Sequence, residues 1–380
     1  MNENLNNVEP VNNEQSSEKN NWTKKIISYI IVFFIGCLIM YAAVYFFPIT
    51  VTESVTKEER NVTITDTGIA EAVAKVYDAV VVVSTYDDNT YVASGTGFVF
   101  RHDDGTYYLL TNHHVIEDGN HVTVTFTDGS VVETEIIGSD EYQDIAVLAI
   151  ETDEEYAVAE LGNNDDTRIG DTAFAVGAPL DSAYSWTVTR GIISGKDRMV
   201  EVSLDNGNYI MKTLQTDAAI NSGNSGGPLC NANGEVIGIT SLKLINDGIE
   251  GMGFAIPIED AIAKAEEIMN GEVSDYPHLG VSMLDFSDAY FSQYYGLIRN
   301  SGLDSGVIVT SVSEDGPAEK GGIQANDIII AMDKEEVPNT AYLRYYLYQH
   351  NVGDTVTLTV YREGDTKDIE VTLGTNRQTT

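Results

Sequence analysis

The sequence predicts a mostly β protein in three parts: an apolar helix near the N-terminus, a large all-β domain and a smaller α+β domain. From residue 79 onward, short runs rich in β-branched residues alternate with Gly, Asp and Asn turns. Repeated short strands of this kind are typical of a barrel or sandwich. After residue 276 the pattern changes to strands interleaved with helical segments. Residues 26 to 47 carry no charged side chain.

The composition limits the classes of partner. The chain has 380 residues and a formal net charge of −38, and this length leaves room for two or three domains. An acidic surface repels nucleic acid and anionic lipid headgroups, so nucleic-acid binding is excluded. With Cys37 in the apolar stretch and Cys230 far from it, no disulfide within a domain is available. Cys230 is expected to be a small buried core residue.

The N-terminal part is predicted to be a membrane anchor. Residues 1 to 25 form a predicted disordered tail, because they are rich in Asn, Glu and Ser. Residues 26 to 47 would span about 33 Å as a helix, enough to cross a bilayer, and Trp22 and Tyr45 lie near its ends. Bulky residues follow the two alanines near the end of this stretch, which favours an uncleaved anchor over a signal peptide. Lysines before the span predict a cytoplasmic N-terminus, with everything after the linker at residues 48 to 66 outside the cytoplasm.

Two globular domains are predicted beyond the linker, over residues 67 to 271 and 276 to 374. The first begins with a short amphipathic helix at residues 69 to 76 and ends with a helix at residues 258 to 269, before Asn-Gly. Its clearest strands are residues 80–85, 122–126, 145–150, 173–176 and 236–240. The second domain has strands at 306–310, 326–330 and 355–361, a one-turn helix at 316–323 and a helix at 340–350.

The most informative motif is Gly-Asn-Ser-Gly-Gly-Pro-Leu at residues 223 to 229. A serine between glycines can sit on a turn that directs two backbone N–H groups at one point, which suits a nucleophile whose attack creates an oxyanion. By itself, such a serine could equally be a structural turn residue. A hydroxyl nucleophile needs a base and an orienting carboxylate, and His114 and Asp144 lie in suitable contexts. The order His, Asp, Ser is that of the chymotrypsin-like double β-barrel.

Five sequence blocks carry a specific resemblance. They occur in order at residues 95–99, 111–116, 144–148, 215–229 and 253–257. The chain resembles the HtrA (Deg) family of membrane-anchored, trypsin-like serine endopeptidases with a C-terminal PDZ domain, over about residues 69 to 373. The resemblance implies a chymotrypsin-like double β-barrel followed by one PDZ domain, a homotrimer, and no cofactor or metal. It further implies degradation of misfolded or unassembled exported proteins, in protein quality control and the stress response.

Two pairs of neighbours compete for the base and the carboxylate. The family pattern Thr-Asn-x-His-Val makes His114 the base, and adjacent residues of a strand point to opposite faces, so His113 should face away from Ser225. The same divergence disfavours a metal site at this histidine pair. Asp144 is preferred to Asp140 because the apolar run after it would bury it at a strand start. Asp140 is expected to accept N–H groups of its turn.

The oxyanion hole is predicted to consist of the backbone N–H groups of Gly223 and Ser225, with the residue between them as a spacer. Ala219 stands six residues before the nucleophile, where trypsin-like enzymes place the pocket floor, and Ile220 follows it. A cationic side chain would be buried there without a partner, so we expect a preference for small aliphatic residues. Asp217 could be mistaken for a trypsin-like selector, but its register excludes this.

The PDZ resemblance implies a peptide site and a regulatory residue. Leu279, Gly280 and Val281 fall where PDZ domains bind a peptide's C-terminal carboxylate, after which the peptide adds to a sheet edge. An ordinary strand start is the alternative, and His278 departs from the aromatic residue common in relatives. Arg198 stands where relatives carry a regulatory-loop arginine that relays PDZ occupancy, although a merely solvated arginine fits equally well.

Two other functions stay open at this point. The chain could be a pseudoprotease or chaperone that binds unfolded proteins without cutting them, or a PDZ scaffold with a passive barrel domain. The complete His, Asp and Ser set argues against the first alternative, and labelling by a fluorophosphonate probe with Ser225→Ala as the control would separate all three functions.

Overall fold

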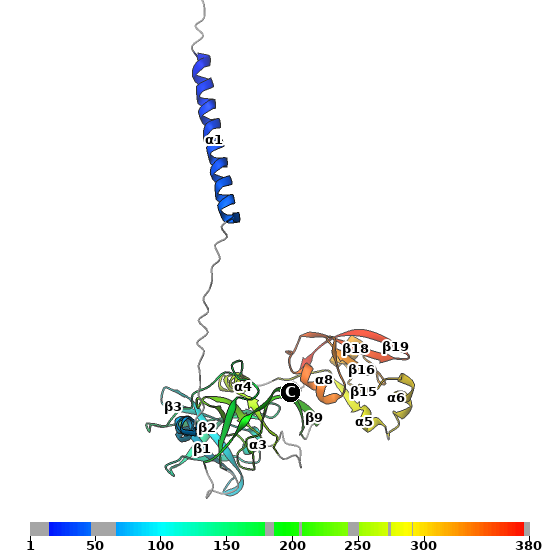
Figure 1. Cartoon of the computed structure of the whole chain (residues 1–380). Helices are drawn as coiled ribbons and strands as arrows, with labels where there is room; N and C mark the ends of the chain where they lie inside the picture. The colour runs from blue at the N-terminus through cyan, green and yellow to red at the C-terminus, as the bar shows by residue number, and fades with distance from the viewer. Residues whose placement is uncertain are drawn as a thin grey trace, which may run out of the picture. The chain divides into compact units, whose positions relative to one another are not determined.

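The computed structural model describes residues 15–46, 66–178, 186–204, 207–241, 251–272, 275–290 and 292–375. The chain divides into two compact units, residues 1–61 and 62–380. Within the described residues, the first unit contains one helix, α1 (Gln15–Phe46), and the second contains all the strands (Figure 1).

Helix α1 starts earlier than the composition predicts. The disordered tail predicted for residues 1 to 25 is wrong from Gln15 onward, because α1 includes residues 15 to 25. Extending an existing helix by a residue adds one hydrogen bond at little cost, whereas starting a new one is unfavourable. The apolar helix therefore continues backwards into polar sequence. Residues 1 to 14 and nearly all of the predicted linker lie outside the described residues. Among the helices of the described part, none combines the length and apolar character that crossing a bilayer demands.

Two closed β-barrels follow the amphipathic helix α2 (Asp66–Val76), as the double-barrel prediction requires. The first has the order β1-β2-β3-β6-β5-β4, with strands β1 (Val80–Asp87), β2 (Thr90–Asp103), β3 (Thr106–Thr111), β4 (His121–Thr125), β5 (Val131–Asp140) and β6 (Ile145–Glu151). The second has the order β10-β11-β12-β9-β8-β7, with strands β7 (Thr172–Gly177), β8 (Thr187–Leu204), β9 (Gly207–Thr216), β10 (Pro228–Asn231), β11 (Val236–Thr240) and β12 (Gly253–Pro257). Helix α3 (His113–Ile116) follows β3.

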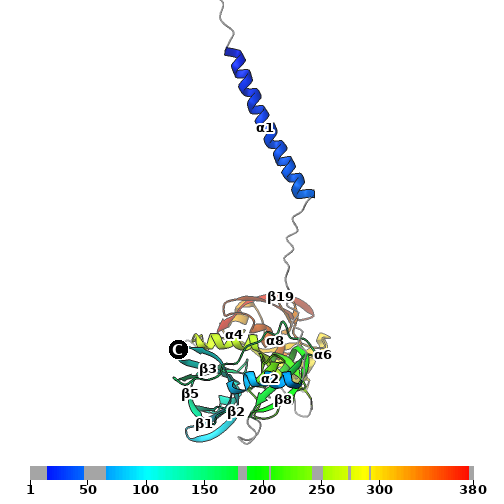
Figure 2. The same cartoon turned by 60° about the vertical axis from the view of Figure 1, so that its left-hand side comes forward.

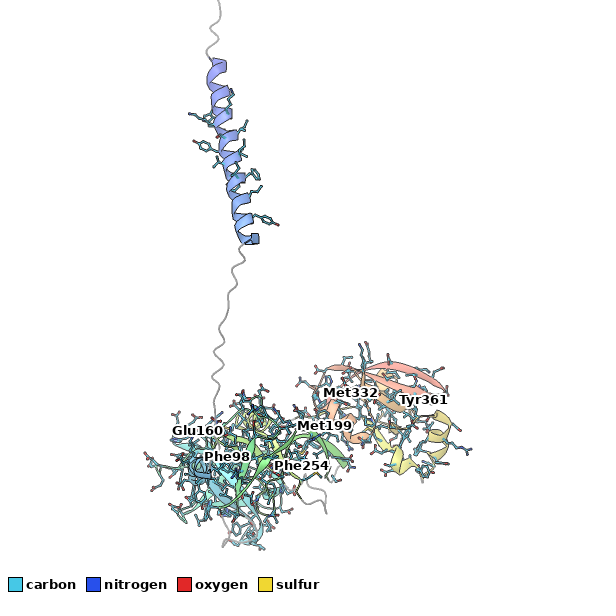
Figure 3. All side chains as sticks on the ribbon, in the orientation of Figure 1. Phe98, Glu160, Met199, Phe254, Met332 and Tyr361 are labelled. Carbon is cyan, nitrogen blue, oxygen red and sulfur yellow. The ribbon has the colours of Figure 1, made fainter. Side chains whose placement is uncertain are left out.

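One hydrophobic core joins the two barrels. It contains Phe98 from the first barrel and Phe174 from the second, both with no exposed surface, together with Val76 of α2 and Ala265 of α4. Helix α4 (Ile258–Met269) has the bounds that its periodicity predicts and packs against β5, β6, β11 and β12 (Figure 2). The two barrels therefore form one domain, which begins with helix α2 and ends with helix α4. Phe98 is labelled in this part of the chain in Figure 3.

The C-terminal domain is a small α+β unit with its own core, which includes Met332 (Figure 3). Its main sheet has the order β14-β15-β16-β18-β19. Its strands are β13 (Pro277–His278), β14 (Val281–Asp285), β15 (Val307–Val312), β16 (Ile328–Met332), β17 (Glu335–Glu336), β18 (Thr355–Arg362), β19 (Asp365–Thr372) and β20 (Gly374–Thr375). Its helices are α5 (Phe286–Ala289), α6 (Tyr295–Ser301), α7 (Pro317–Gly321) and α8 (Thr340–Leu347). Strands β13 and β20 pair, so the domain begins and ends at the same place.

The longest hairpin was not evident from the sequence. Strands β8 and β9 pair antiparallel as far as Leu204 and Gly207 at the tip. The outer half of this hairpin carries many polar side chains. Val202, Tyr209, Ile210 and Met211 of this half are nevertheless buried, but the polar side chains among them weaken the alternation that reveals a half-buried strand. The same reason applies to β19, which pairs with β18 along its full length although most of its side chains are exposed.

Candidate active site

The turn that carries Ser225 lies between β9 and β10 and depends on glycine. Gly223 has φ of 97° and Gly226 has φ of 84°, which is the left-handed region that favours glycine. A Cβ atom at Gly226 would lie 2.1 Å from the Thr96 carbonyl oxygen, so no larger residue fits. The carbonyl oxygen of Ser225 accepts a hydrogen bond from the Thr96 amide at 2.8 Å, and Ser225 itself is 4% exposed. The turn is therefore held tightly against β2.

The two histidines lie on helix α3 rather than on a strand. The strand assumed for them is wrong: β3 ends at Thr111, and the short helix begins two residues later. The histidines nevertheless make separate contacts, because the His114 Nδ1 atom is 2.9 Å from both carboxylate oxygens of Asp144. The ring of His113 contacts Ser139 and Glu117 instead. With the proton on Nδ1, the His114 Nε2 atom can accept a proton.

Asp144 is the most constrained residue of the site. It immediately precedes β6, is 1% exposed and has φ of 54°, an uncommon value for a residue other than glycine. Its carboxylate accepts hydrogen bonds from the His114 amide at 3.1 Å and from the Ser241 hydroxyl at 2.8 Å. The Asn112 side chain donates to its carbonyl oxygen at 2.8 Å. The expectation that Asp144 is buried at a strand start is confirmed, and the charge is compensated by several donors.

Asp140 has the separate role that its position predicts. One of its carboxylate oxygens accepts the backbone N–H groups of Tyr142 and Gln143, at 3.0 and 2.9 Å. It therefore stabilises the turn that leads to Asp144. Its second oxygen accepts a hydrogen bond from Tyr276 at 2.7 Å, which the sequence does not reveal.

Thr96 ties the nucleophile turn to both barrels. Its hydroxyl donates to the Gly223 carbonyl oxygen at 2.6 Å and accepts from the Ala178 amide at 3.0 Å. Its own carbonyl oxygen accepts from the Thr111 hydroxyl at 2.8 Å. Because Thr96 belongs to β2 and Ala178 follows β7, this fully buried threonine joins the barrels beside Ser225.

Several residues that shape the site were missed by sequence reasoning. Ser241 contacts Asp144 from the end of β11 and has no motif of its own. Asn224 is not the spacer that was expected, because it is 1% exposed and its side chain donates to the Ala219 carbonyl oxygen at 3.3 Å. The Thr240 hydroxyl donates to the Asn224 carbonyl oxygen at 2.6 Å. Only the position of Asn224 inside the serine motif hinted at its importance.

Cys230 lies on β10, close to the serine motif, and could be considered as a second nucleophile. It has no exposed surface, as expected for a small core residue. Burial raises the pKa of its thiol far above the ordinary value. The reactive thiolate is therefore suppressed, and Ser225 is the better candidate in this segment.

The predicted pocket residues lie on the segment between β9 and the serine. Ala219 is exposed, whereas Ile220 is 8% exposed. The carbonyl oxygen of Ala219 accepts a hydrogen bond from the Thr189 hydroxyl at 2.9 Å. The carboxylate of Asp217 accepts the backbone N–H of Ile192 at 2.6 Å. The Asp217 carboxylate thus binds the backbone of strand β8. This agrees with the prediction that Asp217 does not select the substrate side chain.

The predicted peptide loop connects β13 to β14. Leu279 is 3% exposed and packs in the core of the C-terminal domain, while Gly280 has φ of 74°. The carbonyl oxygens of Leu279 and Gly280 accept the amides of Ala318 and Ser313, both at 2.8 Å. Val281 then begins β14, an edge strand of the main sheet. The sheet edge needed for peptide addition is therefore present.

Arg198 lies on the β8–β9 hairpin. Its guanidinium Nε atom donates to the Gln215 side chain at 3.1 Å, and its carbonyl oxygen accepts the Thr213 hydroxyl at 3.1 Å. Both partners belong to β9, so these two hydrogen bonds of Arg198 lie within the hairpin.

Comparisons with known proteins agree with this geometry. Residues 95–239 match the family model described as a trypsin-like peptidase domain, and residues 277–373 match the PDZ domain model. The serine protease Do-like HtrA of Lactococcus lactis subsp. lactis (strain IL1403) is 37% identical over 297 residues, which cover 76% of this chain and 72% of that protein. The chain belongs to the HtrA family of serine proteases.

Other HtrA proteins give a consistent picture. The serine protease Do-like HtrA of Bacillus subtilis (strain 168) is 41% identical over 284 residues, which cover 74% of this chain but only 63% of that relative. Among solved structures, the HtrA-type protease AlgW with decapeptide has a TM-score of 0.64 at 29% identity and covers 82% of this chain and 99% of its own. The serine endoprotease from Yersinia pestis has a TM-score of 0.62 at 29% identity, covering 83% of this chain and 100% of its own.

The Ser241 hydrogen bond leads to a first prediction. The substitution Ser241→Ala removes one donor to the Asp144 carboxylate, and a hydrogen bond to a charged group is worth about 1.5 kcal/mol. We expect kcat for a peptide substrate to fall roughly tenfold with little change in KM. Steady-state kinetics test this, with Ser203→Ala, an exposed hydroxyl on the β8–β9 hairpin, as the control. Equal kinetics in both variants would contradict the prediction.

Proposed function

We propose that this HtrA protein is a serine endopeptidase with His114, Asp144 and Ser225 as its triad. The observation that carries the proposal is the contact of His114 Nδ1 with the buried Asp144 carboxylate at 2.9 Å, in a chain of the HtrA family. His114 takes the proton of the Ser225 hydroxyl as it attacks the scissile carbonyl carbon. Asp144 maintains the imidazole tautomer and stabilises the imidazolium that forms.

The oxyanion of the tetrahedral intermediate is assigned to the backbone N–H groups of Gly223 and Ser225. The positive φ of Gly223, 97°, supports this assignment because it turns the backbone in a way open mainly to glycine. Donors that are already oriented need no rearrangement when the negative charge develops, which is why such holes lower the barrier strongly. His114 then returns the proton to the leaving amine, and water hydrolyses the acyl-enzyme by the same steps.

The substrates are proposed to be misfolded or regulatory exported proteins, with C-terminal peptides binding at the PDZ groove. The PDZ match and the decapeptide in the structure of AlgW support a peptide-responsive enzyme. A non-cleaving chaperone or a PDZ scaffold is the alternative. Both alternatives would survive loss of Ser225, and the endopeptidase would not.

The substitution Ser225→Ala is therefore the decisive test. We expect loss of casein hydrolysis by a factor on the order of 10⁶ in kcat, with an unchanged fold. A fluorophosphonate probe should label the wild-type protein and leave Ser225→Ala unlabelled, with Ser203→Ala as a labelled control. Casein degradation by Ser225→Ala at near the wild-type rate would disprove the assignment.

The specificity is proposed to be for small aliphatic residues before the cut. Ala219 and Ile220 offer no carboxylate, and the nearby Asp217 carboxylate is engaged by a backbone N–H at 2.6 Å. A buried lysine or arginine would lack a counter-charge there. Mass-spectrometric mapping of cuts in an unfolded protein is expected to find most of them after Val, Ala or Ile. A majority after Lys or Arg would refute the pocket.

The chain is further proposed to be a single-pass membrane protein with an extracytoplasmic enzyme, assembled as a homotrimer. Residues 26 to 47 carry no charge, and large apolar side chains of α1, such as Phe33 and Leu38, are exposed. Exposed apolar side chains along such a helix are favourable in the hydrocarbon core of a bilayer and unfavourable in water. The trimer rests on the family resemblance, and light scattering would measure its mass.

Deletion of residues 1 to 52 tests the anchor. Because the proposed triad and the PDZ domain lie beyond this segment, we expect the shortened protein to move from the membrane fraction to the soluble fraction with its peptidase activity retained. Fractionation followed by a casein assay measures both properties. A folded, inactive product would mean that the segment does more than tether the enzyme.

Activity is proposed to be gated by peptide, with Arg198 coupling the PDZ groove to the oxyanion hole. Arg198 lies on β8, and the paired strand β9 leads into the segment that carries Ser225. A peptide can shift an equilibrium between inactive and active forms only by its differential affinity, typically 1–3 kcal/mol. Stimulation of roughly 5- to 150-fold is therefore the expected scale.

Arg198→Ala is expected to remove most of the stimulation while leaving the affinity for a peptide with an apolar C-terminus nearly unchanged. Turnover with and without peptide, together with fluorescence anisotropy, separates these effects. Arg168→Ala is a suitable control, since that exposed arginine pairs only locally with Asp171 at 3.0 Å. Full stimulation in Arg198→Ala would identify Arg198 as a solvated loop residue.

A further inference from the structure

Four tyrosine rings meet where the barrel domain adjoins the C-terminal domain. Tyr142 comes from the turn before β6, Tyr209 from β9, Tyr276 from the segment between the domains and Tyr348 from the end of α8. The Tyr142 ring centroid lies 4.8, 4.6 and 5.2 Å from those of Tyr209, Tyr276 and Tyr348, respectively. Tyr276 and Tyr348 are 4.5 Å apart. We name these four residues the tyrosine cluster.

The cluster is partly buried: Tyr209 is 4% exposed, and the other three tyrosines are half-buried. Burial raises the pKa of Tyr209 and of Tyr276 above the ordinary phenol range, and raises the pKa of Tyr348 to about 12. These three phenols are therefore neutral at physiological pH, and the contact between the domains depends on ring packing and on hydrogen bonds from the neutral hydroxyl groups. Packed aromatic pairs of this kind favour one mutual arrangement over others.

Helix α8 is attached to the β8–β9 hairpin beside the cluster. The Arg344 guanidinium lies over the Tyr209 ring, 4.9 Å from its centroid, and donates to the Asn208 carbonyl oxygen at 2.9 Å. A Cβ atom at Gly207 would lie 2.6 Å from the Arg344 Nη1 atom. The guanidinium of Arg344 thus packs directly against the hairpin tip. A side chain at position 207 would displace it.

The cluster also connects directly to the turn that presents Asp144. The Tyr276 hydroxyl donates to one Asp140 carboxylate oxygen at 2.7 Å. The other oxygen of Asp140 accepts the amides of Tyr142 and Gln143, at 3.0 and 2.9 Å. Asp140 is 4% exposed, so removal of any of these donors leaves a buried carboxylate less well compensated. Tyr142 is thus held twice, by its amide and by its ring.

The position of the Asp144 carboxylate depends on the turn that precedes it. Asp144 lies in the left-handed region with φ of 54°, which aspartate adopts in turns more readily than most residues, so the turn fixes where the side chain starts. Two residues before Asp144, Tyr142 is packed between a ring of β9 and a ring of the C-terminal domain. A shift of this turn would move the carboxylate relative to His114.

We infer that Tyr276 and Tyr348 are positioning residues of the active site, through which the C-terminal domain holds the turn that carries Asp144. The inference rests on the proposed triad and adds residues outside it. Helix α8 is attached to two elements: its first residue, Thr340, donates to Asp285 of edge strand β14, and Arg344, near the middle of the helix, contacts the hairpin. A peptide added to β14 would therefore lie next to the helix whose end packs on Tyr142.

The test uses the full-length chain in detergent and compares kcat with KM for one peptide substrate. Tyr276→Phe keeps the ring and removes only the hydrogen bond to Asp140; we expect kcat to fall about 5- to 10-fold with KM changed less than twofold. Tyr348→Ala removes a ring contact, with an expected loss of about tenfold in kcat, and Tyr348→Phe is expected to recover most of it. Tyr290→Ala, an exposed tyrosine of the same domain, is the control.

The possible outcomes are distinct. If wild-type protein cleaves, Ser225→Ala does not, and Tyr276→Phe and Tyr348→Ala stay within twofold of wild-type kcat, the positioning role is refuted and the triad stands. An increase in kcat would also overturn the inference, because the contact would then restrain the site. An equal loss in Tyr290→Ala would reduce the effect to general destabilisation of the domain. If Tyr348→Ala fails to fold, Tyr276→Phe decides alone. Full activity in Ser225→Ala would instead remove the triad itself.

Discussion

The buried carboxylate of Asp144 is the constraint on which the site depends. A charge with 1% exposure must be compensated by nearby donors, and those donors come from different parts of the chain. His114 belongs to the first barrel, whereas Ser241 follows β11 of the second. The carboxylate is therefore fully satisfied only when both barrels are closed and in register. The hydrogen bonds that hold Asp144 in the candidate triad therefore form only when the two barrels pack together.

The serine turn is constrained by lack of space rather than by charge. Gly226 has no room for a side chain beside the Thr96 carbonyl oxygen, and Thr96 also receives or donates hydrogen bonds that reach Gly223 and Ala178. Such close backbone approach is open only to glycine. The glycines of the serine motif thus serve packing between the barrels as well as chemistry, since the same turn must satisfy both.

The C-terminal domain shares a contact surface with the machinery it is proposed to regulate. Helix α8 contacts the edge strand β14 through its first residue, Thr340, and β9 through Arg344. Because packed interiors are stiff, a helix held in this way transmits displacement instead of absorbing it. The proposed peptide sensing and the proposed support of the Asp144 carboxylate can therefore rely on the same element, whereas Arg198 lies on a different part of the hairpin.

Much of the chemistry could be predicted from the sequence, since a nucleophile, a base and a carboxylate need particular residue types in particular contexts. The serine motif indicated Ser225, the family pattern indicated His114, and the buried run after Asp144 indicated its place before β6. Local periodicity also sufficed for α4, whose bounds agree with the pattern. In each case the signal lies within a few neighbouring residues.

Other features could be seen only in the tertiary structure. The donor from Ser241 to Asp144 spans 97 residues, and that from Tyr276 to Asp140 spans 136. Neither serine nor tyrosine is unusual in its local sequence, so nothing nearby reveals the partner. The strand assumed for the histidines does not form: β3 ends at Thr111 and α3 begins at His113, and between them the Asn112 side chain donates to the carbonyl oxygen of Asp144, which is distant in sequence. The sequence by itself determined which groups can react, and barrel closure decided which of them meet, because contacts between distant segments depend on the closed architecture rather than on local pattern.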